Sequence, residues 1–173
     1  MPDYPIRKSV RLSGHDYASP GAYFVTVCTH GRACLFGEVH DGHVHLSLPG
    51  DIVRATWHDL PRHLPDVEVD ALVVIPNHVH GILALHGRGT ACRAPSEAFG
   101  RPVPGSIPTI VRSFKSSATR EVNRLRGTPG AAVWQRGYFE HIIRTTDDLD
   151  RLRRYVESNP LRWTLDRENP ANA

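Results

Sequence analysis

Residues 67–85, VEVDALVVIPNHVHGILAL, decide the fold of this chain. The stretch holds two apolar runs, 67–75 and 78–85, that are rich in β-branched residues, which favour the pleated, half-buried surface of a strand. Pro76 and Asn77 separate the runs; this pair favours a turn, but it is also compatible with a bulge in a continuous strand path. Both interpretations predict adjacent strands in one sheet.

The segments around this stretch extend the β structure. Residues 22–29 are aromatic and β-branched and predict a first core strand, and residues 138–144 predict a last one. Asp41-Gly42 accepts the positive φ angles of a two-residue turn, so the segments 34–39 and 43–48 on either side of it predict a β-hairpin.

Three further segments carry apolar residues at helical spacing. They predict helices over about 51–64, 107–126 and 147–158, with Thr146 as the N-cap of the last helix. The order of strands and helices predicts an α+β sandwich, in which helices pack on an antiparallel sheet.

Length and composition fit one soluble globular domain. The chain has 173 residues, of which 40% are hydrophobic and 23% charged, and its mean hydropathy is -0.35. We expect a single domain over residues 1–173, with a mobile loop at about 86–106 and a short polar tail at 166–173. No apolar run approaches the roughly 20 residues of a membrane helix, the first residues lack a signal-peptide core, and the three cysteines form no Cys-x-x-Cys pair. These features predict a cytoplasmic protein without a membrane partner.

The formal charge of +3 hides an asymmetry between the two halves of the chain. Residues 1–100 carry 8 basic and 10 acidic side chains, whereas residues 101–167 carry 13 basic and 7 acidic ones. The second segment is therefore a candidate surface for a polyanion, although a solvated charged face explains the same count.

His78-Val79-His80 is the sharpest local feature, because a strand places residues i and i+2 on the same face. Two neutral imidazoles on one face can hold a divalent cation. Two solvated histidines are the plainer explanation, and His43 and His45 have the same spacing beside a turn. We favour the first pair, because it lies within a strongly apolar run, where polar side chains need a reason.

The terminal helix carries a second constellation. Tyr155 lies at the border of its apolar stripe, and Asn159 lies on the same side one turn later. One phenol and one amide therefore project together from the edge that faces the core. Packing of an amphipathic tyrosine and closure of the helix by an asparagine before Pro160 explain the same pattern.

Three motifs in order resemble the single-tyrosine HUH transposases, with the REP-associated tyrosine transposases as their nearest members. The resemblance runs from about Tyr23 to Trp163 and rests on PNHVHGI at 76–82, VWQRGYFEHIIR at 133–144 and RYVESNP at 154–160. It implies a ferredoxin-like α+β sandwich, with a central antiparallel sheet that carries the HUH motif on a central strand.

The resemblance also implies roles for individual residues. His78 and His80 match the two metal-binding histidines, and Asn159 matches the amide that completes the shell around Mg²⁺ or Mn²⁺. Tyr155 matches the nucleophile, and Tyr138 is its main rival. His141 is left outside the catalytic set, because packing explains it.

The implied activity is metal-dependent cleavage and joining of single-stranded DNA through a 5′-phosphotyrosine. A phenol with a pKa of about 10 is a weak nucleophile at neutral pH, so its attack on a phosphodiester needs a cation that polarises the phosphate. The covalent bond stores the energy for rejoining, so no ATP or nucleotide cofactor is required.

The resemblance implies a substrate of single-stranded DNA that folds into palindromic hairpins, and a protein that acts as a monomer or a homodimer. Cations on the 107–126 helix are candidates for phosphate contacts, and the Trp-Gln motif is a candidate for contacts with unpaired bases. The candidate DNA-binding residues are Arg112, Lys115, Arg120, Arg124, Trp134, Gln135, Arg136 and Tyr138.

Two other functions compete with this one. A hairpin-binding DNA or RNA module without strand-transfer activity would need the same arginines and aromatics. A hydrolytic metal-dependent phosphodiesterase would use water in place of tyrosine as the nucleophile. Covalent attachment of DNA to the protein separates the transposase from both.

Overall fold

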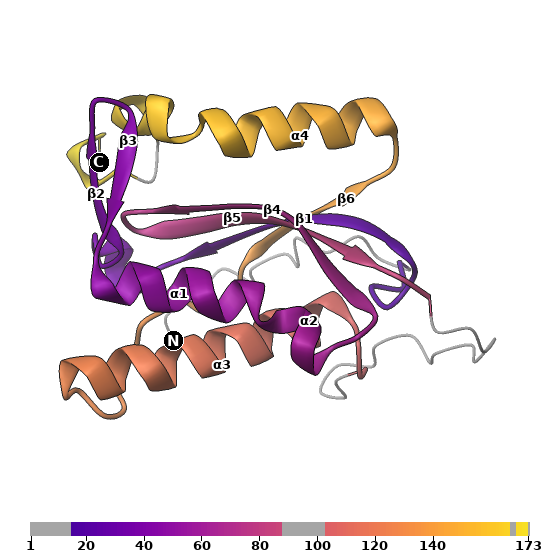
Figure 1. The fold of residues 1–173 in the computed structure, drawn as a ribbon, viewed down its shortest axis with the longest axis horizontal. Helices are drawn as coiled ribbons and strands as arrows, with labels where there is room; N and C mark the ends of the chain where they lie inside the picture. The colour runs from indigo at the N-terminus through magenta and orange to yellow at the C-terminus, as the bar shows by residue number, and fades with distance from the viewer. Residues whose placement is uncertain (1–14, 88–102, 167–168, 173) are drawn as a thin grey trace, which may run out of the picture.

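A four-stranded antiparallel sheet lies at the centre of the molecule (Figure 1). This computed structural model describes residues 15–87, 103–166 and 169–172. The strand order is β4-β5-β1-β6. The strands are β1 (Gly21–Cys28), β4 (Val67–Ile75), β5 (His78–Leu85) and β6 (Phe139–Ile143).

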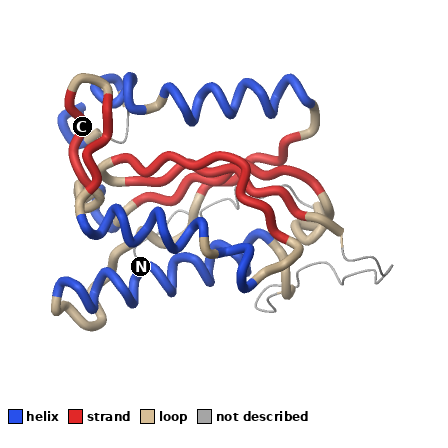
Figure 2. The backbone as a smooth tube through the Cα atoms, viewed as in Figure 1, coloured by secondary structure: helices blue, strands red, loops and turns tan. Residues whose placement is uncertain are grey.

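Helices cover both faces of the sheet (Figures 1 and 2). One face packs against α1 (Leu48–His58) and α3 (Ile107–Arg126), and the other lies under α4 (Thr146–Ser158). The path β1-α1-β4-β5-α3-β6 with its strand order is the split β-α-β arrangement of the ferredoxin-like fold. The expected fold class is therefore confirmed.

The remaining elements are short. A separate hairpin pairs β2 (Gly37–His40) with β3 (His43–Leu46), and both turn residues have positive φ, 50° at Asp41 and 74° at Gly42. The hairpin is confirmed, with shorter strands than predicted. The other short elements are η1 (His30–Arg32), α2 (Leu60–His63), η2 (Pro160–Leu165) and η3 (Pro170–Asn172). Over the described ranges, no helix is both long and apolar enough to cross a membrane.

Pro76 and Asn77 form the turn of an antiparallel hairpin, in which Ile75 pairs with His78. Of the two interpretations of the sequence, the turn is confirmed and the continuous strand path is excluded. A register shift does occur in β4, between Val69 and Ala71.

Alternation along β5 divides its side chains between two apolar clusters. Ile82 packs with α4 residues in the smaller cluster, whereas Val79 and Leu83 belong to the larger cluster beneath α1 and α3. Gly81 faces α1 so closely that a Cβ atom there would lie 2.3 Å from Cζ2 of Trp57. Because period-2 alternation sends even positions to the α4 side, His78 and His80 share that face with Ile82.

The first helix differs from its predicted bounds of 51–64. It begins at Leu48, because the Ser47 side chain accepts a hydrogen bond from the Gly50 amide and because proline is tolerated in a first turn. It ends at His58 and restarts as α2, because Pro61 has no N–H to donate to the carbonyl of Trp57.

Two smaller boundaries also differ. The N-cap of α4 is Thr145 rather than Thr146, since the Thr145 hydroxyl accepts from the Asp148 amide at 3.1 Å. Tyr138 precedes β6 instead of lying on it. Most of the expected loop at 86–106 and part of the expected tail at 166–173 lie outside the described residues. The α3 bounds match the prediction.

Candidate metal and tyrosine site

Two imidazoles converge on the α4 side of β5. The Nε2 atoms of His78 and His80 lie 3.0 Å apart, and both side chains are buried. Register places the neighbouring strand residue Thr26 directly opposite His80 and Cys28 opposite His78. The two histidines predicted from their i, i+2 spacing are therefore brought together in the structure.

Hydrogen bonds on the far side of each ring orient the two imidazoles. Asn77 donates its amide N–H to the carbonyl of Arg32 at 3.2 Å, so its Oδ1 is the atom that faces Nδ1 of His78 at 2.8 Å. His78 therefore carries a proton on Nδ1. Nδ1 of His80 lies 2.8 Å from the hydroxyl of Thr26, which can accept from it or donate to it.

The short distance between the rings has a chemical consequence. When both rings carry their proton on Nδ1, the two Nε2 lone pairs of His78 and His80 face each other at 3.0 Å. Two lone pairs at that distance repel unless a proton or a cation lies between them. The pair is thus arranged as ligands for a metal ion, with outer partners that orient each ring.

Two oxygen donors complete the cluster. Oδ2 of Asp166 lies 3.8 Å from Nε2 of His78, and His78, His80 and Asp166 each offer a ligand atom within 4.8 Å of the others. Asn159 is 1% exposed and lines a cleft together with His80 and Asp166. Its Oδ1 has no hydrogen-bond partner among the described residues. A buried acceptor without a donor costs free energy, so a cation there would satisfy it. These residues fit a divalent metal.

Sequence reasoning proposed Asn159 but missed Asp166. Asn159 follows Tyr155 at helical spacing, whereas Asp166 reaches the site only because η2 folds back after α4 and brings the ring of Trp163 to 6.1 Å from that of His78. No regular period relates Asp166 to the other ligands. It was counted only as the first residue of a polar tail.

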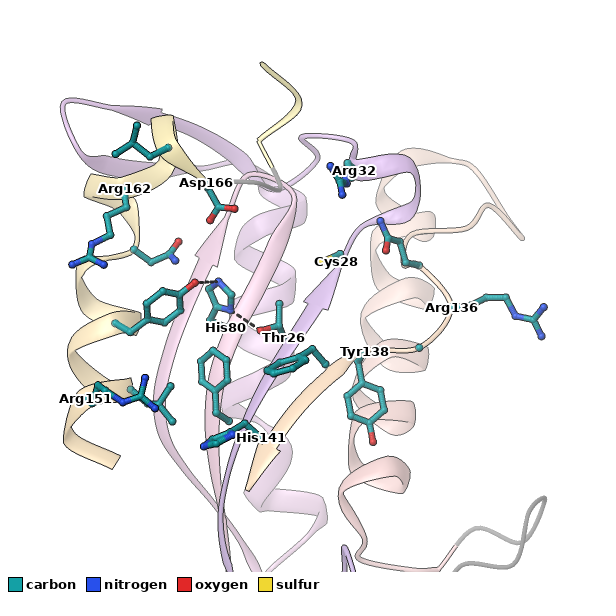
Figure 3. A pocket seen from close by; sticks show the side chains of 18 residues that line it. Thr26, Cys28, Arg32, His80, Arg136, Tyr138, His141, Arg151, Arg162 and Asp166 are labelled. Atoms are coloured by element: carbon teal, nitrogen blue, oxygen red, sulfur yellow. Dashed lines mark hydrogen bonds between the residues drawn. The ribbon is translucent and has the colours of Figure 1, made fainter. Parts of the chain in front are cut away.

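Tyr155 lies beside the histidine pair. Its hydroxyl is 3.4 Å from Nε2 of His80, an interaction drawn as a dashed line in Figure 3. The Tyr155 ring makes edge contacts with Phe24 and His80, at centroid distances of 5.9 and 5.2 Å. A phenol is therefore held next to the candidate metal ligands.

The position of Tyr155 follows from how α4 docks on the sheet. Leu152 and Val156 are buried against the sheet, which confirms the predicted apolar stripe. Arg153 adds a two-pronged ion pair with Asp70, at the irregular point of β4. Docking and helical spacing together place Tyr155 beside His80 and turn Asn159 into the same cleft.

A cleft of about 1010 Å³ opens beside this cluster. Its lining includes four arginines and a single carboxylate. Figure 3 shows Arg151 and Arg162 on the α4 side of His80, and Arg136 and Tyr138 on the opposite side. A cation-lined cleft that ends at metal ligands and a phenol suits a phosphate-bearing substrate.

Comparisons with known proteins show what the chain resembles in sequence and in fold. No model of a known protein family matches the sequence. The chain is 33% identical over 166 residues to an uncharacterised protein of Haemophilus influenzae, a match that covers 92% of this chain and 91% of that protein. It is also 23% identical over 147 residues to a "Putative REP-associated tyrosine transposase" of the same organism, covering 85% and 74% of the two chains. The solved structure of a REP-associated tyrosine transposase bound to a REP hairpin has the same fold, with a TM-score of 0.55 at 22% identity, over 88% of this chain and 73% of that one. The chain is therefore similar to REP-associated tyrosine transposases in sequence and in fold.

The similarity to tyrosine transposases draws attention to the tyrosines of the cleft. Two tyrosines line the cleft, Tyr155 and Tyr138. Tyr155 has the hydroxyl beside His80, whereas Tyr138 packs at the edge of the larger apolar cluster. This geometry favours Tyr155 as the nucleophile.

The four cations expected on α3 lie on a helix that covers the opposite face of the sheet (Figure 1). Lys115 donates from Nζ to the carbonyls of Gln135 and Gly137, at 2.6 and 3.0 Å, and burial lowers its pKa. Arg120 and Arg124 share Glu121. None of these residues, nor Arg112, lines the cleft, and their contact with DNA stays a prediction.

The Trp-Gln motif is divided by the fold. Gln135, Arg136 and Tyr138 line the cleft, whereas Trp134 is 7% exposed and packs between Phe36 and Phe114, at centroid distances of 5.1 and 5.5 Å. A base cannot stack on a ring enclosed in this way. The prediction that Trp134 contacts bases is therefore wrong, because the side chain belongs to the core.

His141 joins two elements at the rim of the cleft. Its Nε2 donates to Oδ2 of Asp148 at 2.8 Å, which links β6 to the first turn of α4. This hydrogen bond, together with Arg151, holds the pKa of Asp148 below its ordinary value. His141 therefore has a structural contact, but this contact is a hydrogen bond at an exposed side chain and not the packing that was expected.

Proposed function

We propose that this chain is a single-tyrosine transposase that cleaves and rejoins single-stranded, hairpin-forming DNA through Tyr155. The observation that carries the proposal is the 3.4 Å contact between the Tyr155 hydroxyl and Nε2 of His80, within a cluster that also holds His78, Asn159 and Asp166. The hairpin substrate is supported by a REP-associated tyrosine transposase of the same fold, whose structure was solved bound to a REP hairpin.

His78 and His80 would hold the metal through Nε2, with oxygen donors from Asp166 and Asn159. Imidazole with carboxylate and amide oxygens is a mixed donor set, and its oxygen ligands suit Mg²⁺ or Mn²⁺. When bound, the metal withdraws charge from the nonbridging oxygens of the scissile phosphate. Thr26 and Asn77 keep the two rings oriented toward that point.

The chemical step belongs to Tyr155. Its phenolic oxygen attacks phosphorus, a new P–O bond forms, and the bond from phosphorus to the 3′-oxygen breaks. The phenolic proton leaves to solvent, and the departing 3′-oxygen takes up a proton to become a 3′-hydroxyl. The strand downstream of the cut stays attached as a 5′-phosphotyrosine, and attack by a 3′-hydroxyl reverses the step to rejoin DNA.

The test uses the polarity of this intermediate. Because the attached fragment lies 3′ of the cut, single-stranded hairpin DNA from the flanks of the gene is labelled at its 3′ end. It is incubated with Mn²⁺ or Mg²⁺ and run on a denaturing protein gel. We expect the label to migrate with the wild-type protein and with Tyr138→Phe, the matched control from the other tyrosine of the cleft. We expect no adduct with Tyr155→Phe, with His78→Ala or with excess EDTA.

Three outcomes would contradict the proposal. An adduct that persists in Tyr155→Phe assigns the nucleophile to another residue. Cleavage without any adduct identifies a hydrolytic phosphodiesterase. Tight hairpin binding without cleavage identifies a binding module for DNA or RNA.

A further inference from the structure

Phe139 is an exposed aromatic ring within the cleft. It begins β6, on the edge of the sheet, and 45% of it is exposed. It is the only aromatic among the exposed large hydrophobic residues of the described ranges. Neither apolar cluster includes it, so packing of the core does not account for a phenylalanine at this position.

Only the side chain of Phe24 separates the Phe139 ring from the candidate metal ligand His80. Its centroid lies 6.5 Å from that of Phe24, and Phe24 in turn stacks on His80 at 5.4 Å. Phe139 also pairs in register with Thr26, whose hydroxyl orients His80. A group resting on Phe139 is therefore placed next to the point where Tyr155 meets a phosphate.

Charge around the ring favours a nucleic acid over an apolar ligand. Arg136, three residues before Phe139, is exposed and has no ion-pair partner among the described residues. Arg162 lies across the cleft, on the α4 side of His80 (Figure 3). It is also exposed and has no ion-pair partner among the described residues. An aromatic face flanked by uncommitted cations is the combination by which proteins bind unpaired strands.

We propose that Phe139 is a stacking platform for an unpaired base adjacent to the phosphate that Tyr155 attacks. The inference rests on the proposed function and adds how the strand is placed in the cleft. Every base has a π-face, so the contact tolerates any sequence. It holds the strand in register while Arg136 and Arg162 contact phosphates. Duplex DNA, whose bases are already stacked, cannot use the platform.

The test measures stacking in a protein that cannot cut. The hairpin DNA from the gene flanks carries 2-aminopurine in turn at each nucleotide beside the cleaved bond, and it is titrated with Tyr155→Phe protein in EDTA. Stacking on Phe139 quenches the fluorescence at one of these positions. Adding Phe139→Ala abolishes that quenching and weakens Kd by roughly 5- to 150-fold. Phe139→Trp restores both, whereas Phe139→Leu, which is apolar without a π-face, restores neither in full.

Leu125→Ala is the matched control. Leu125 has the same exposed fraction, 45%, but lies on α3 across the sheet, so its removal leaves quenching and Kd unchanged. Thermal unfolding verifies that each variant is folded. Equal quenching and Kd with and without the Phe139 ring would overturn the inference.

Failure of the inference can be told apart from failure of the proposed function. Adduct formation by the Tyr155-intact protein is measured on the same DNA. If the adduct forms but Phe139→Ala binds and quenches like its parent, only the platform is wrong. If quenching depends on Phe139 but no adduct forms, the platform stands and the cleavage proposal falls.

Discussion

At the scale of single residues, the site depends on side chains that orient its two histidines. Thr26 and Asn77 each hold one imidazole by its Nδ1, so that both Nε2 atoms point to one place. Such outer partners set the tautomer and the orientation of a ligand. Metal affinity should therefore respond to them.

Thr26→Val removes the hydroxyl and keeps the shape of the side chain. Because His80 then loses the hydroxyl that orients its ring at Nδ1, we expect Mn²⁺ affinity to fall by about 10- to 100-fold. Isothermal titration with Mn²⁺ measures this. Thr56→Val is the control, since the Thr56 hydroxyl bonds only to the Ile52 carbonyl on α1. Equal affinity in both variants would show that Thr26 does not orient a ligand.

Residue-scale prediction from sequence succeeded where a regular period operates. The period of a strand aligns His78 with His80, and the period of a helix aligns Tyr155 with Asn159. It failed for Asp166, which an irregular chain reversal brings to the site. It also failed for Trp134, because the sequence does not show which aromatic side chains the core encloses.

At the scale of elements, α4 carries the proposed nucleophile, Tyr155, and has to stay docked on the sheet. Two contacts dock it: the apolar stripe and the ion pair between Arg153 and Asp70. The apolar stripe fixes which face is buried. The ion pair fixes where along β4 the helix rests, and so the height of Tyr155 above His80.

Asp70→Asn should slow the chemical step more than it weakens DNA binding. A small shift of α4 along the sheet moves Tyr155 relative to the phosphate. Misplacement of a reacting group by about 1 Å can lower the rate by up to about 100-fold. Single-turnover adduct formation gives the rate, and fluorescence anisotropy gives Kd. Asp150→Asn is the control, because Asp150 pairs with the same Arg153 within α4 and makes no link to the sheet. An equal loss of rate in both variants would contradict the docking role.

The close approach of β5 to α1 gives a second element-scale prediction. Gly81→Ala places a Cβ about where Trp57 lies, at 2.3 Å from Cζ2, so we expect it to destabilise the fold by about 1–3 kcal/mol. Urea denaturation measures the free energy of unfolding. In a Trp57→Phe background the smaller ring leaves space, so the cost of Gly81→Ala should shrink. An unchanged cost there would show that the clash is not with Trp57.

Element types were predictable because hydrophobic periods are long and regular in this chain, as in α3. The first helix was mispredicted because Pro61 removes one hydrogen bond inside an otherwise unbroken apolar pattern. The cap of α4 was misplaced by one residue because Thr145 and Thr146 are equivalent in sequence terms. Only the local backbone decides which hydroxyl reaches the Asp148 amide.

At the scale of the whole molecule, the sheet separates two surfaces. The cleft with its arginines lies on the side of α4. The other face is covered by α1 and α3 (Figure 1). The sequence showed an excess of cations in its second half, but it could not assign them to a surface, since α3 and α4 both lie in that half. The topology of the sheet makes the assignment.

Salt dependence reports which surface the DNA contacts. Each lost phosphate contact lowers the slope of log K against log salt by about 0.7 for a single strand. We expect Arg136→Gln and Arg162→Gln each to lower the slope by about that amount, measured by anisotropy across a salt series. Arg112→Gln tests the prediction that α3 also contacts phosphates. An unchanged slope for both cleft variants would contradict a strand path through the cleft.

The central claim is that Tyr155 forms a covalent bond with DNA beside the histidine pair, and peptide mapping tests it most directly. Wild-type protein is incubated with Mn²⁺ and the hairpin DNA, digested with nuclease and protease, and analysed by mass spectrometry. We predict a phosphonucleotide on the peptide that contains Tyr155, and none when EDTA replaces Mn²⁺. A modified Tyr138 peptide, or cleaved DNA with no modified peptide, would contradict the account.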